Sequence, residues 1–487
     1  MDPANSDAVE RALQLLTDQQ IESHPVLVVA DAERYARRGN MLLFRSRMLR
    51  ALETSNGHLR ASTAMRLGGE EINAGNSSSA LKVTALGLTA LDEEDVVTRA
   101  GLLAVRAVAF HQGGSQELAR QAIDEATFVV AHCGESEVSV RVWQMAGLIA
   151  FYSGNSAEAN LNALRAVRLL SVGGVHPHAS RVYFLLYALA FTEWKPEVAI
   201  VHAERAYDAA ISAADLAFAL MCLEAQLGIV ADSGDVRSVA VIESRLRDAE
   251  QKAHHYVPYG EFIRGLARAQ VLASDCRYVE ARHTLGACNA SLMRRSEHVE
   301  RDAWLALFTL FSGNDVETLS LSQRALASSL SSDIQDITNL TDVNNIERAH
   351  LVLAVVLIKL HKRRELSAVL EVLAKTNYEP LRKAVANLVD LSQSRTTLCA
   401  DIKPGILAIL CERLFEGAER AALTTAELRV LRLLADGMTS KEAAARLGRS
   451  PKTIDNQVES ILAKLGAQNR TQAVSIARRT GVLAESP

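Results

Sequence analysis

Two short helices separated by a tight turn are encoded in residues 439–466, TSKEAAARLGRSPKTIDNQVESILAKLG. Thr439 and Glu442 are three residues apart, the spacing of a capping box that begins a helix. Gly448 tolerates the left-handed conformation that ends a helix. The turn that follows, residues 448–450, has the length that a helix-turn-helix uses. The stretch therefore predicts a helix-turn-helix.

The flanking residues extend this prediction to four helices. Ser450 as a cap and Pro451 at the first helical position begin the third helix, and Gly466 ends it. Two more pairs have capping-box spacing: Thr424 with Glu427, and Asn469 with Gln472. We therefore expect a small domain of four separately capped helices in residues 421–487.

The predicted third helix has two different faces. Its apolar residues recur at helical spacing and form one buried stripe: Ile454, Val458, Ile461, Leu462 and Leu465. The opposite face carries Lys452, Asp455, Asn456 and Glu459. Asn pairs bidentately with adenine, and Asp or Glu accepts from the cytosine amino group, so this face suits reading of the major groove. An ordinary solvated face has the same composition, and the residues alone do not separate the two interpretations.

A resemblance favours the first interpretation. The residues that carry it span almost the whole segment: Leu423 to Glu427, Val430-Leu431, Leu434-Ala435, Gly437, Lys441-Glu442, Ala444, Leu447-Gly448, Ser450, Thr453-Ile454, Lys464 to Gly466 and Asn469 to Val474. Together they resemble the DNA-binding domain of LuxR-type transcription regulators. The resemblance implies that the third helix enters the major groove of double-stranded DNA and that the fourth helix supplies a dimer contact.

The resemblance also assigns roles to residues. Base contacts fall on Asp455, Asn456 and Glu459. Phosphate contacts fall on Lys441, Arg449, Ser450, Lys452, Thr453, Lys464 and Arg470. The dimer contact falls on Val474, Ala477 and Arg478.

Four positions depart from the family's pattern. Ala426 replaces its usual Arg, Ala443 its usual Ile and Gln457 its usual His. Asp455 replaces a frequent Lys, and we interpret it as a base contact because a carboxylate beside phosphates is repelled. These departures bear on affinity for DNA more than on the fold.

Charge is divided unevenly along the chain. Residues 421–487 hold ten Lys or Arg against six Asp or Glu, a net of +4, whereas the whole chain has −4 and the first 420 residues therefore −8. A single module of this size buries only about 600–1,000 Å² on DNA. We expect a homodimer on two half-sites about one helical turn apart.

Turns recur through the preceding region at intervals of 36 to 42 residues. They are Gly39-Asn40, Gly75-Asn76, Gly113-Gly114, Gly154-Asn155, Trp194-Lys195, Gly234-Asp235, Cys276-Arg277 and Gly313-Asn314. Small residues return where helices should touch: Ala122, Ala163, Ala203 and Ala206. The period resembles tetratricopeptide (TPR) repeats with lengthened loops, so we expect an α-solenoid of about eight helix pairs. A further pair is expected from Ile346 to Leu373, with its turn near Lys362.

A TPR-like array joined to a LuxR-type tail resembles the maltose-activator class of regulators. That class usually carries an ATPase module, but no stretch here fits Gly-x-x-x-x-Gly-Lys-Ser/Thr, so we expect no ATP switch and no cofactor. The solenoid is expected to bind a small-molecule, peptide or protein effector. RNA polymerase is a further candidate partner.

Other classes of protein are disfavoured. No apolar run reaches the roughly 18 residues of a membrane span, and no secretory signal begins the chain, so we expect a cytoplasmic protein. The six cysteines lack Cys-x-x-Cys spacing, and His176-Pro177-His178 and His254-His255 lack an acidic or Cys partner at ligand spacing, so no metal is expected. No catalytic Ser-His-Asp or Cys-His set is apparent, which argues against an enzyme.

The predicted fold is therefore all-α, with three parts. Residues 1–390 form a TPR-like sensor or interaction domain, residues 391–420 a linker with a short helix from Ile406 to Glu416, and residues 421–487 the DNA-binding domain. The expected function is a sequence-specific transcription regulator. The alternative is a TPR-type interaction scaffold with a weak or vestigial DNA-binding tail.

Overall fold

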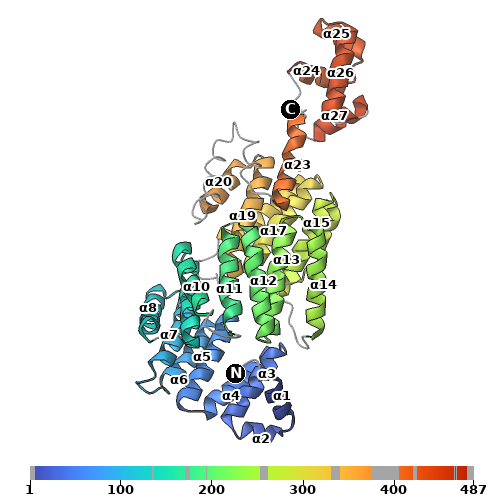
Figure 1. Cartoon of the computed structure of the whole chain (residues 1–487). Coiled ribbons are helices and arrows are strands. Elements are labelled where there is room, and N and C mark those ends of the chain that lie inside the picture. Colours follow the sequence, from blue (N-terminus) through green and yellow to red (C-terminus); the bar gives the residue numbers. More distant parts are fainter. Residues whose placement is uncertain are drawn as a thin grey trace. The chain divides into compact units, whose positions relative to one another are not determined.

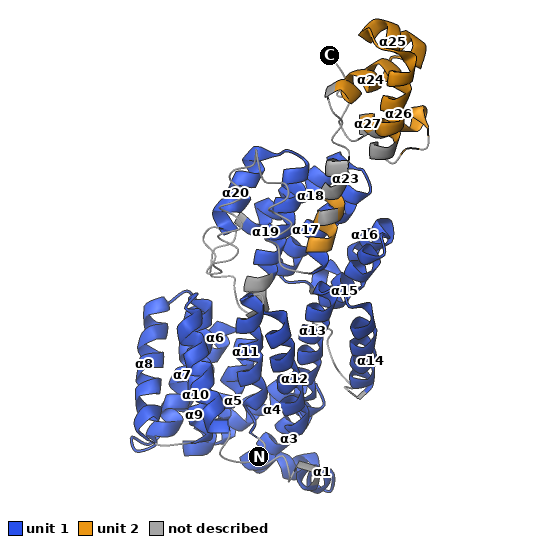
Figure 2. Cartoon of the chain, turned by 45° about the horizontal axis from the view of Figure 1, so that its top comes forward, with its two compact units in different colours: residues 1–390, 403–407 blue, residues 391–402, 408–487 orange. Residues whose placement is uncertain are grey.

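A computed structural model describes residues 6–133, 136–170, 176–193, 195–252, 261–330, 340–373, 405–420, 425–465, 467 and 469–479. Every regular element in these ranges is a helix, and they contain no strand. Two compact units divide the chain: residues 1–390 with 403–407, and residues 391–402 with 408–487 (Figure 2). The predicted all-α fold is confirmed.

Helical hairpins in sequence order build the first unit (Figure 1). Two short helices come first, α1 (Ser6–Gln14) and α2 (Asp18–Glu22). The hairpins follow: α3 (Pro25–Arg37) with α4 (Met41–Thr54), α5 (Gly57–Asn73) with α6 (Ser77–Leu88), α7 (Val96–Gln112) with α8 (Gln116–His132), α9 (Glu137–Tyr152) with α10 (Ser156–Leu170), α11 (Ala179–Thr192) with α12 (Pro196–Ser212), α13 (Leu216–Asp232) with α14 (Val236–Lys252), α15 (Glu261–Ser274) with α16 (Tyr278–Gly286), α17 (Arg295–Phe311) with α18 (Asp315–Leu330), and α19 (Leu340–Lys359) with α20 (Arg363–Leu373). A 3-10 turn, η2 (Ala290–Leu292), lies between α16 and α17.

Neighbouring hairpins stack in a repeated manner. The first helix of one pair packs on the first helix of the next, as with α5 on α7, α7 on α9 and α15 on α17. The second helix of one pair also packs on the first helix of the next, as with α8 on α9 and α12 on α13. Each hairpin thus buries its apolar surface on its neighbours, which confirms the predicted α-solenoid.

The turns inside the hairpins share one geometry. At the end of α5, Gly75 has a φ of +76°, its N–H donates to Ile72 O at 2.9 Å, and the N–H of Asn76 donates to Glu71 O at 2.7 Å. This is a Schellman motif, which needs one residue in the left-handed region. The same position falls on Gly39, Gly114, Gly154, Gly234, Cys276, Gly313 and His361.

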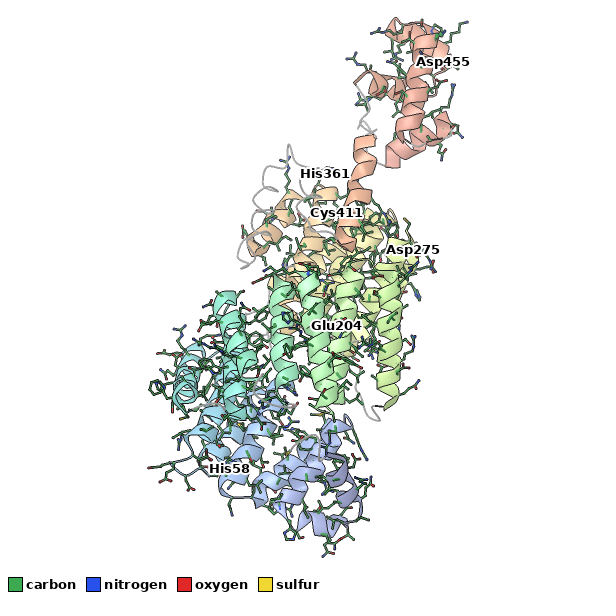
Figure 3. The ribbon with its side chains drawn as sticks, viewed as in Figure 1. His58, Glu204, Asp275, His361, Cys411 and Asp455 are labelled. Carbon is green, nitrogen blue, oxygen red and sulfur yellow. The ribbon has the colours of Figure 1, made fainter. Side chains whose placement is uncertain are left out.

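These positions confirm the turns expected at seven of the eight recurring sites and the additional turn near Lys362. The eighth site involves Trp194, which lies outside the described residues, although α12 begins directly after Lys195. His361 in the last turn is labelled in Figure 3.

Alanines lie at the helix contacts as expected. Ala163, Ala203 and Ala206 are fully buried, and Ala122 is 8% exposed. The largest apolar cluster extends through these contacts from Ile72 on α5 to Ile229 on α13. Close packing of this kind gives the repeats their hydrophobic core.

Four helices of the second unit form the predicted DNA-binding domain: α24 (Thr425–Ala435), α25 (Ser440–Leu447), α26 (Pro451–Leu465) and α27 (Arg470–Arg479). The central helix α26 packs on the other three. They are preceded by α23 (Ile406–Arg420), which confirms the short helix expected from Ile406 and extends it beyond Glu416. The rest of the predicted linker, residues 391–404, lies outside the described residues.

Two kinds of feature are missing from the part of the chain that the structure describes. None of its helices combines the length and apolar character needed to cross a bilayer. None of its groups of three or more His, Cys, Asp or Glu side chains is arranged to hold a metal ion. The described cysteines are free thiols: Cys133, Cys222, Cys276, Cys288 and Cys411.

Candidate nucleic-acid interface

The helix before the turn, α25, begins with the predicted capping box. Thr439 Oγ1 accepts from the N–H of Glu442 at 3.4 Å, and Glu442 Oε2 accepts from the N–H of Thr439 at 2.7 Å. These hydrogen bonds favour the charged carboxylate and lower the pKa of Glu442. The start of α25 is thereby fixed by its own sequence.

The turn between α25 and α26 also has the predicted geometry. Gly448 has a φ of +62° and a ψ of +38°, and the N–H of Arg449 donates to Ala444 O at 3.0 Å. Ser450 Oγ then accepts from the N–H of Thr453 at 3.1 Å and caps α26, whose first residue is Pro451. Left-handed backbone at the first position and a cap at the last confine the turn to residues 448–450.

The apolar stripe of α26 faces the core of the domain. Ile454 and Ile461 are fully buried, Val458 is 7% exposed and Leu462 packs partly buried against them. The other helices contribute Val430, Leu431, Leu434, Ala443, Ala444, Ala473 and Ala477 to this cluster. The predicted stripe is confirmed in these four residues, while the side chain of Leu465 lies outside the described ones.

A polar contact that the sequence analysis missed also holds α26 in place. Ser460 Oγ donates to Glu427 Oε1 at 2.7 Å, and Glu427 is only 6% exposed. The sequence predicts a capping box of Glu427 with Thr424, and Thr424 lies outside the described residues. The contact joins residues 33 positions apart, so no local spacing reveals it.

The predicted base-reading residues lie together on the solvent side of α26. Asp455, Asn456 and Glu459 are all exposed, and Asp455 and Glu459 are one helical turn apart. Asp455 is labelled on this helix in Figure 3. The structure thus brings the three side chains onto one free face, opposite the buried stripe.

Four of the predicted phosphate-binding residues lie in the turn and the first turn of α26: Arg449, Ser450, Lys452 and Thr453. Lys441 lies at the start of α25 and Arg470 at the start of α27. Exposed positions are Lys441, Arg449, Ser450, Lys452, Thr453 and Arg470. Lys464 lies near the end of α26, and its side chain is outside the described ones. The hydroxyls of Ser450 and Thr453 are 2.8 Å apart, so both sit at the helix N-terminus, where backbone N–H groups favour an anion.

The expected dimer residues divide between core and surface. Ala477 on α27 is fully buried in the domain's own core, so its side chain offers no surface to a second copy. Val474 is partly exposed and packs on the same core. The side chain of Arg478 lies outside the described ones.

Two departures from the family pattern have different surroundings. Ala443 is fully buried beneath α26, where a smaller side chain reduces the apolar contact. Ala426 is exposed, so its replacement of an Arg changes surface charge and not the core.

Comparison with known proteins decides the family of this segment. Residues 421–477 match the family described as bacterial regulatory proteins, luxR family. The segment belongs to the LuxR family. The match covers α24, α25 and α26 completely and α27 as far as Ala477.

Relatives of the LuxR-family segment are named as transcription regulators. The chain is 40% identical over 83 residues to the transcriptional regulatory protein YdfI of Bacillus subtilis, covering 17% of this chain and 39% of that protein. It is 40% identical over 74 residues to the DNA-binding transcriptional activator DevR/DosR of Mycobacterium tuberculosis, covering 14% and 34%. It is 43% identical over 61 residues to the HTH-type transcriptional activator RamA of Corynebacterium glutamicum, covering 12% and 22%. The chain therefore spans less than two fifths of these relatives.

One solved structure resembles the chain over most of its length. It is described as the crystal structure of the APC/C hetero-tetramer Cut9-Hcn1, with a TM-score of 0.44 and 15% identity. The alignment covers 98% of this chain and 92% of that one.

Proposed function

We propose that the protein is a sequence-specific DNA-binding transcription regulator. One observation carries this proposal: α26 buries Ile454, Val458 and Ile461 on one side and exposes Asp455, Asn456 and Glu459 on the other. The naming of LuxR-family relatives as transcription regulators supports it.

Each exposed residue has a proposed partner. Asn456 pairs with adenine in the major groove, and Asp455 and Glu459 accept from cytosine amino groups. The proposed phosphate contacts come from Arg449, Ser450, Lys452 and Thr453 at the turn, and from Lys441, Lys464 and Arg470 on the helices. These phosphate contacts orient α26 and carry no sequence information.

The protein is proposed to act as a homodimer, because one module of this size buries little surface on DNA. Val474 and Arg478 on α27 are the proposed contact residues, and buried Ala477 supports the helix from inside. The proposal for the first unit is that its helical repeats bind a small-molecule, peptide or protein effector. RNA polymerase is the partner expected at the promoter.

The test is a mobility shift of the full-length protein on the DNA upstream of its own gene, at two salt concentrations and with excess random competitor. Specific binding should survive the competitor. Binding that is only non-specific, with a steep salt dependence, contradicts the proposal and favours an interaction scaffold with a vestigial tail.

Two substitutions separate base contacts from phosphate contacts. Asn456→Ala should cost about 1–3 kcal/mol on the preferred site and relax sequence choice, whereas Lys452→Ala should weaken all sequences alike and reduce the salt slope by about 1. Arg432→Ala is the matched control, since Arg432 is also exposed but lies on α24. Equal losses on all sequences for Asn456→Ala and Lys452→Ala exclude base reading by Asn456.

A further inference from the structure

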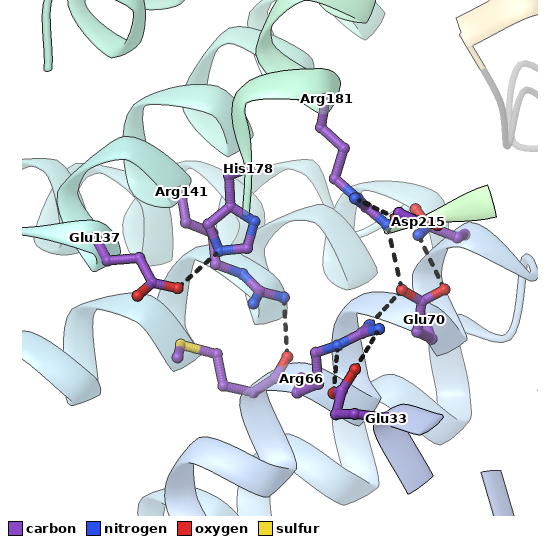
Figure 4. A network of polar contacts seen from close by, with 10 residues as sticks. Glu33, Arg66, Glu70, Glu137, Arg141, His178, Arg181 and Asp215 are labelled. Carbon is purple, nitrogen blue, oxygen red and sulfur yellow. Dashed lines mark hydrogen bonds and ion pairs between the residues drawn. The ribbon is translucent and has the colours of Figure 1, made fainter. Parts of the chain in front are cut away.

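In the first unit, a network of charged side chains joins hairpins that are far apart in the sequence (Figure 4). Arg66 on α5 donates from Nε to Glu33 Oε1 on α3 at 2.9 Å and also pairs with Glu70. On α11, Arg181 Nη2 lies 3.5 Å from Glu70 Oε1, and Arg181 Nη1 lies 3.0 Å from Oδ2 of Asp215, which caps α13. Three carboxylates therefore compensate these two guanidinium groups.

Arg141 on α9 lies within this network but forms no direct ion pair with a carboxylate of the described residues. It is only 6% exposed, and its Nη2 donates to the backbone oxygen of Met65 at 2.9 Å. Its Nε is buried without a hydrogen-bond partner, and no described carboxylate forms an ion pair with it. Burial, together with the nearby charges of Arg66 and Arg181, lowers the pKa of Arg141 to about 10, and the carboxylates of Glu70 and Glu137 offset only part of this shift. A buried guanidinium whose Nε makes no hydrogen bond is costly, so its presence calls for an explanation.

The position of Arg141 is built into the neighbouring helix. Its guanidinium rests against α5 at Gly69, where a methyl group would overlap Nη2. A glycine inside a helix is less favourable than an alanine. The space that Gly69 leaves is therefore used to hold this guanidinium.

The surroundings of Arg141 are partly open to solvent and can donate hydrogen bonds. The side chains of Arg181 and His178 are 20% and 16% exposed, and Glu137 at the rim is 62% exposed. Burial and the charges of Arg141 and Arg181 lower the pKa of His178 well below its ordinary value. The lowered pKa favours the neutral ring, which has one N–H donor, and His178 Nε2 lies 3.9 Å from Glu137 Oε1 at the rim.

We propose that Arg141, with Arg181 and His178, binds the anionic group of a small-molecule effector, a carboxylate or a phosphate. A guanidinium presents paired N–H donors that match either group, and a bound anion supplies the direct ion pair that Arg141 lacks among the described residues. The regulatory meaning of the site rests on the proposed function, but the binding itself does not require DNA.

A comparable arginine shows what an ordinary structural role looks like. Arg106 on α7 donates from Nη1 to Leu81 O at 3.1 Å and lies over the ring of Phe110. It is half-buried, and burial lowers its pKa without any contribution from a neighbouring arginine. Arg106 therefore serves as the matched control for Arg141, with the same kind of backbone contact but no surrounding arginines.

The test titrates the full-length protein with inorganic phosphate and, separately, with succinate, at constant ionic strength and without DNA. Heat of binding and thermal unfolding are followed for the wild type, Arg141→Gln, Gly69→Ala and Arg106→Gln. At least one anion should bind saturably to the wild type and to Arg106→Gln. Arg141→Gln should bind about tenfold to a hundredfold more weakly, the value of a hydrogen bond to a charged group. Gly69→Ala keeps every charge but displaces the guanidinium, so it should also weaken binding.

Several outcomes overturn the inference: no saturable binding of either anion, equal binding by Arg141→Gln and the wild type, wild-type binding by Gly69→Ala, or an equal loss in Arg106→Gln. Tighter binding of phosphate or of succinate identifies the charged group of the effector. Failure of these titrations leaves the proposed DNA binding untouched, and failure of the mobility shift leaves the anion site untouched.

Discussion

Replacing Gly75 by alanine and Cys276 by glycine should change the stability of the first unit in opposite directions. Both residues occupy the left-handed position of the same turn, with φ values of +76° and +62°. The N–H groups of Cys276 and Arg277 donate to Ala273 O and Leu272 O at 3.0 and 2.9 Å, as their counterparts do at Gly75. The two turns therefore differ in whether a Cβ is present, and not in their hydrogen bonds.

The magnitude follows from the backbone alone. A Cβ at Gly75 would meet no atom within 4 Å, so no steric contact adds to the conformational cost. A left-handed residue with a side chain costs roughly 1–2 kcal/mol, and alanine recovers about 0.4–1 kcal/mol by restricting the unfolded chain. Gly75→Ala should therefore lose about 1 kcal/mol, and Cys276→Gly should gain about as much because exposed Cys276 contributes little burial.

Urea unfolding followed by circular dichroism measures both changes. Gly286→Ala is the control, because Gly286 also faces open space but lies in α16 without a positive φ. Alanine should stabilise the protein there by up to about 1 kcal/mol. A stabilising Gly75→Ala, or a destabilising Cys276→Gly, would refute the assignment of these turns to the left-handed conformation.

Two further predictions concern the charged network and the dimer. Burial alone would raise the pKa of Glu70, but Arg66 and Arg181 outweigh it and lower the pKa from 4.5 to about 2. That shift corresponds to roughly 3 kcal/mol of unfolding free energy, present above pH 4.5 and lost as the pH falls toward 2. The Glu70→Gln variant should therefore be destabilised by about this amount at pH 7 and progressively less below pH 4.5. Urea unfolding of the variant and the wild type across this pH range measures the effect. A difference in unfolding free energy that stays constant with pH would contradict the ion pairs. Val474→Arg should reduce cooperative binding to two half-sites while leaving the affinity for a single half-site unaffected. Unchanged cooperativity on the paired site, measured by mobility shift, would exclude this contact.

Local chemistry explains how much of the fold was predictable from the sequence. The capping box at Thr439, the left-handed Gly448 and the recurring turn glycines each act within a few residues of themselves. Periodicity likewise placed Ile454 and Val458 in the core. Such signals are visible along the chain because the interaction and the residues that make it are adjacent in sequence.

Contacts between distant residues were not predictable in this way. Ser460 meets Glu427 only because α24 and α26 cross, and neither residue has a local pattern that indicates the other. The burial of Ala477 also depends on how α27 packs, since an alanine suits a helix surface and a core equally well. Whether a residue on such a helix can make a contact at the surface is therefore known only once the tertiary packing is known.

The charged network also bears on how the repeats act together. In a simple solenoid each hairpin contacts only its neighbours, and stability is a sum of nearest-neighbour terms. Here Arg181 meets Glu70 across 111 residues, so hairpins that are not adjacent in sequence share a half-buried carboxylate. An anion bound at Arg141 would lie beside these same groups. Its charge would therefore act on charged side chains of α5, α9 and α11 together. The network thus gives one small ligand a way to influence several repeats together, which separate nearest-neighbour contacts do not provide.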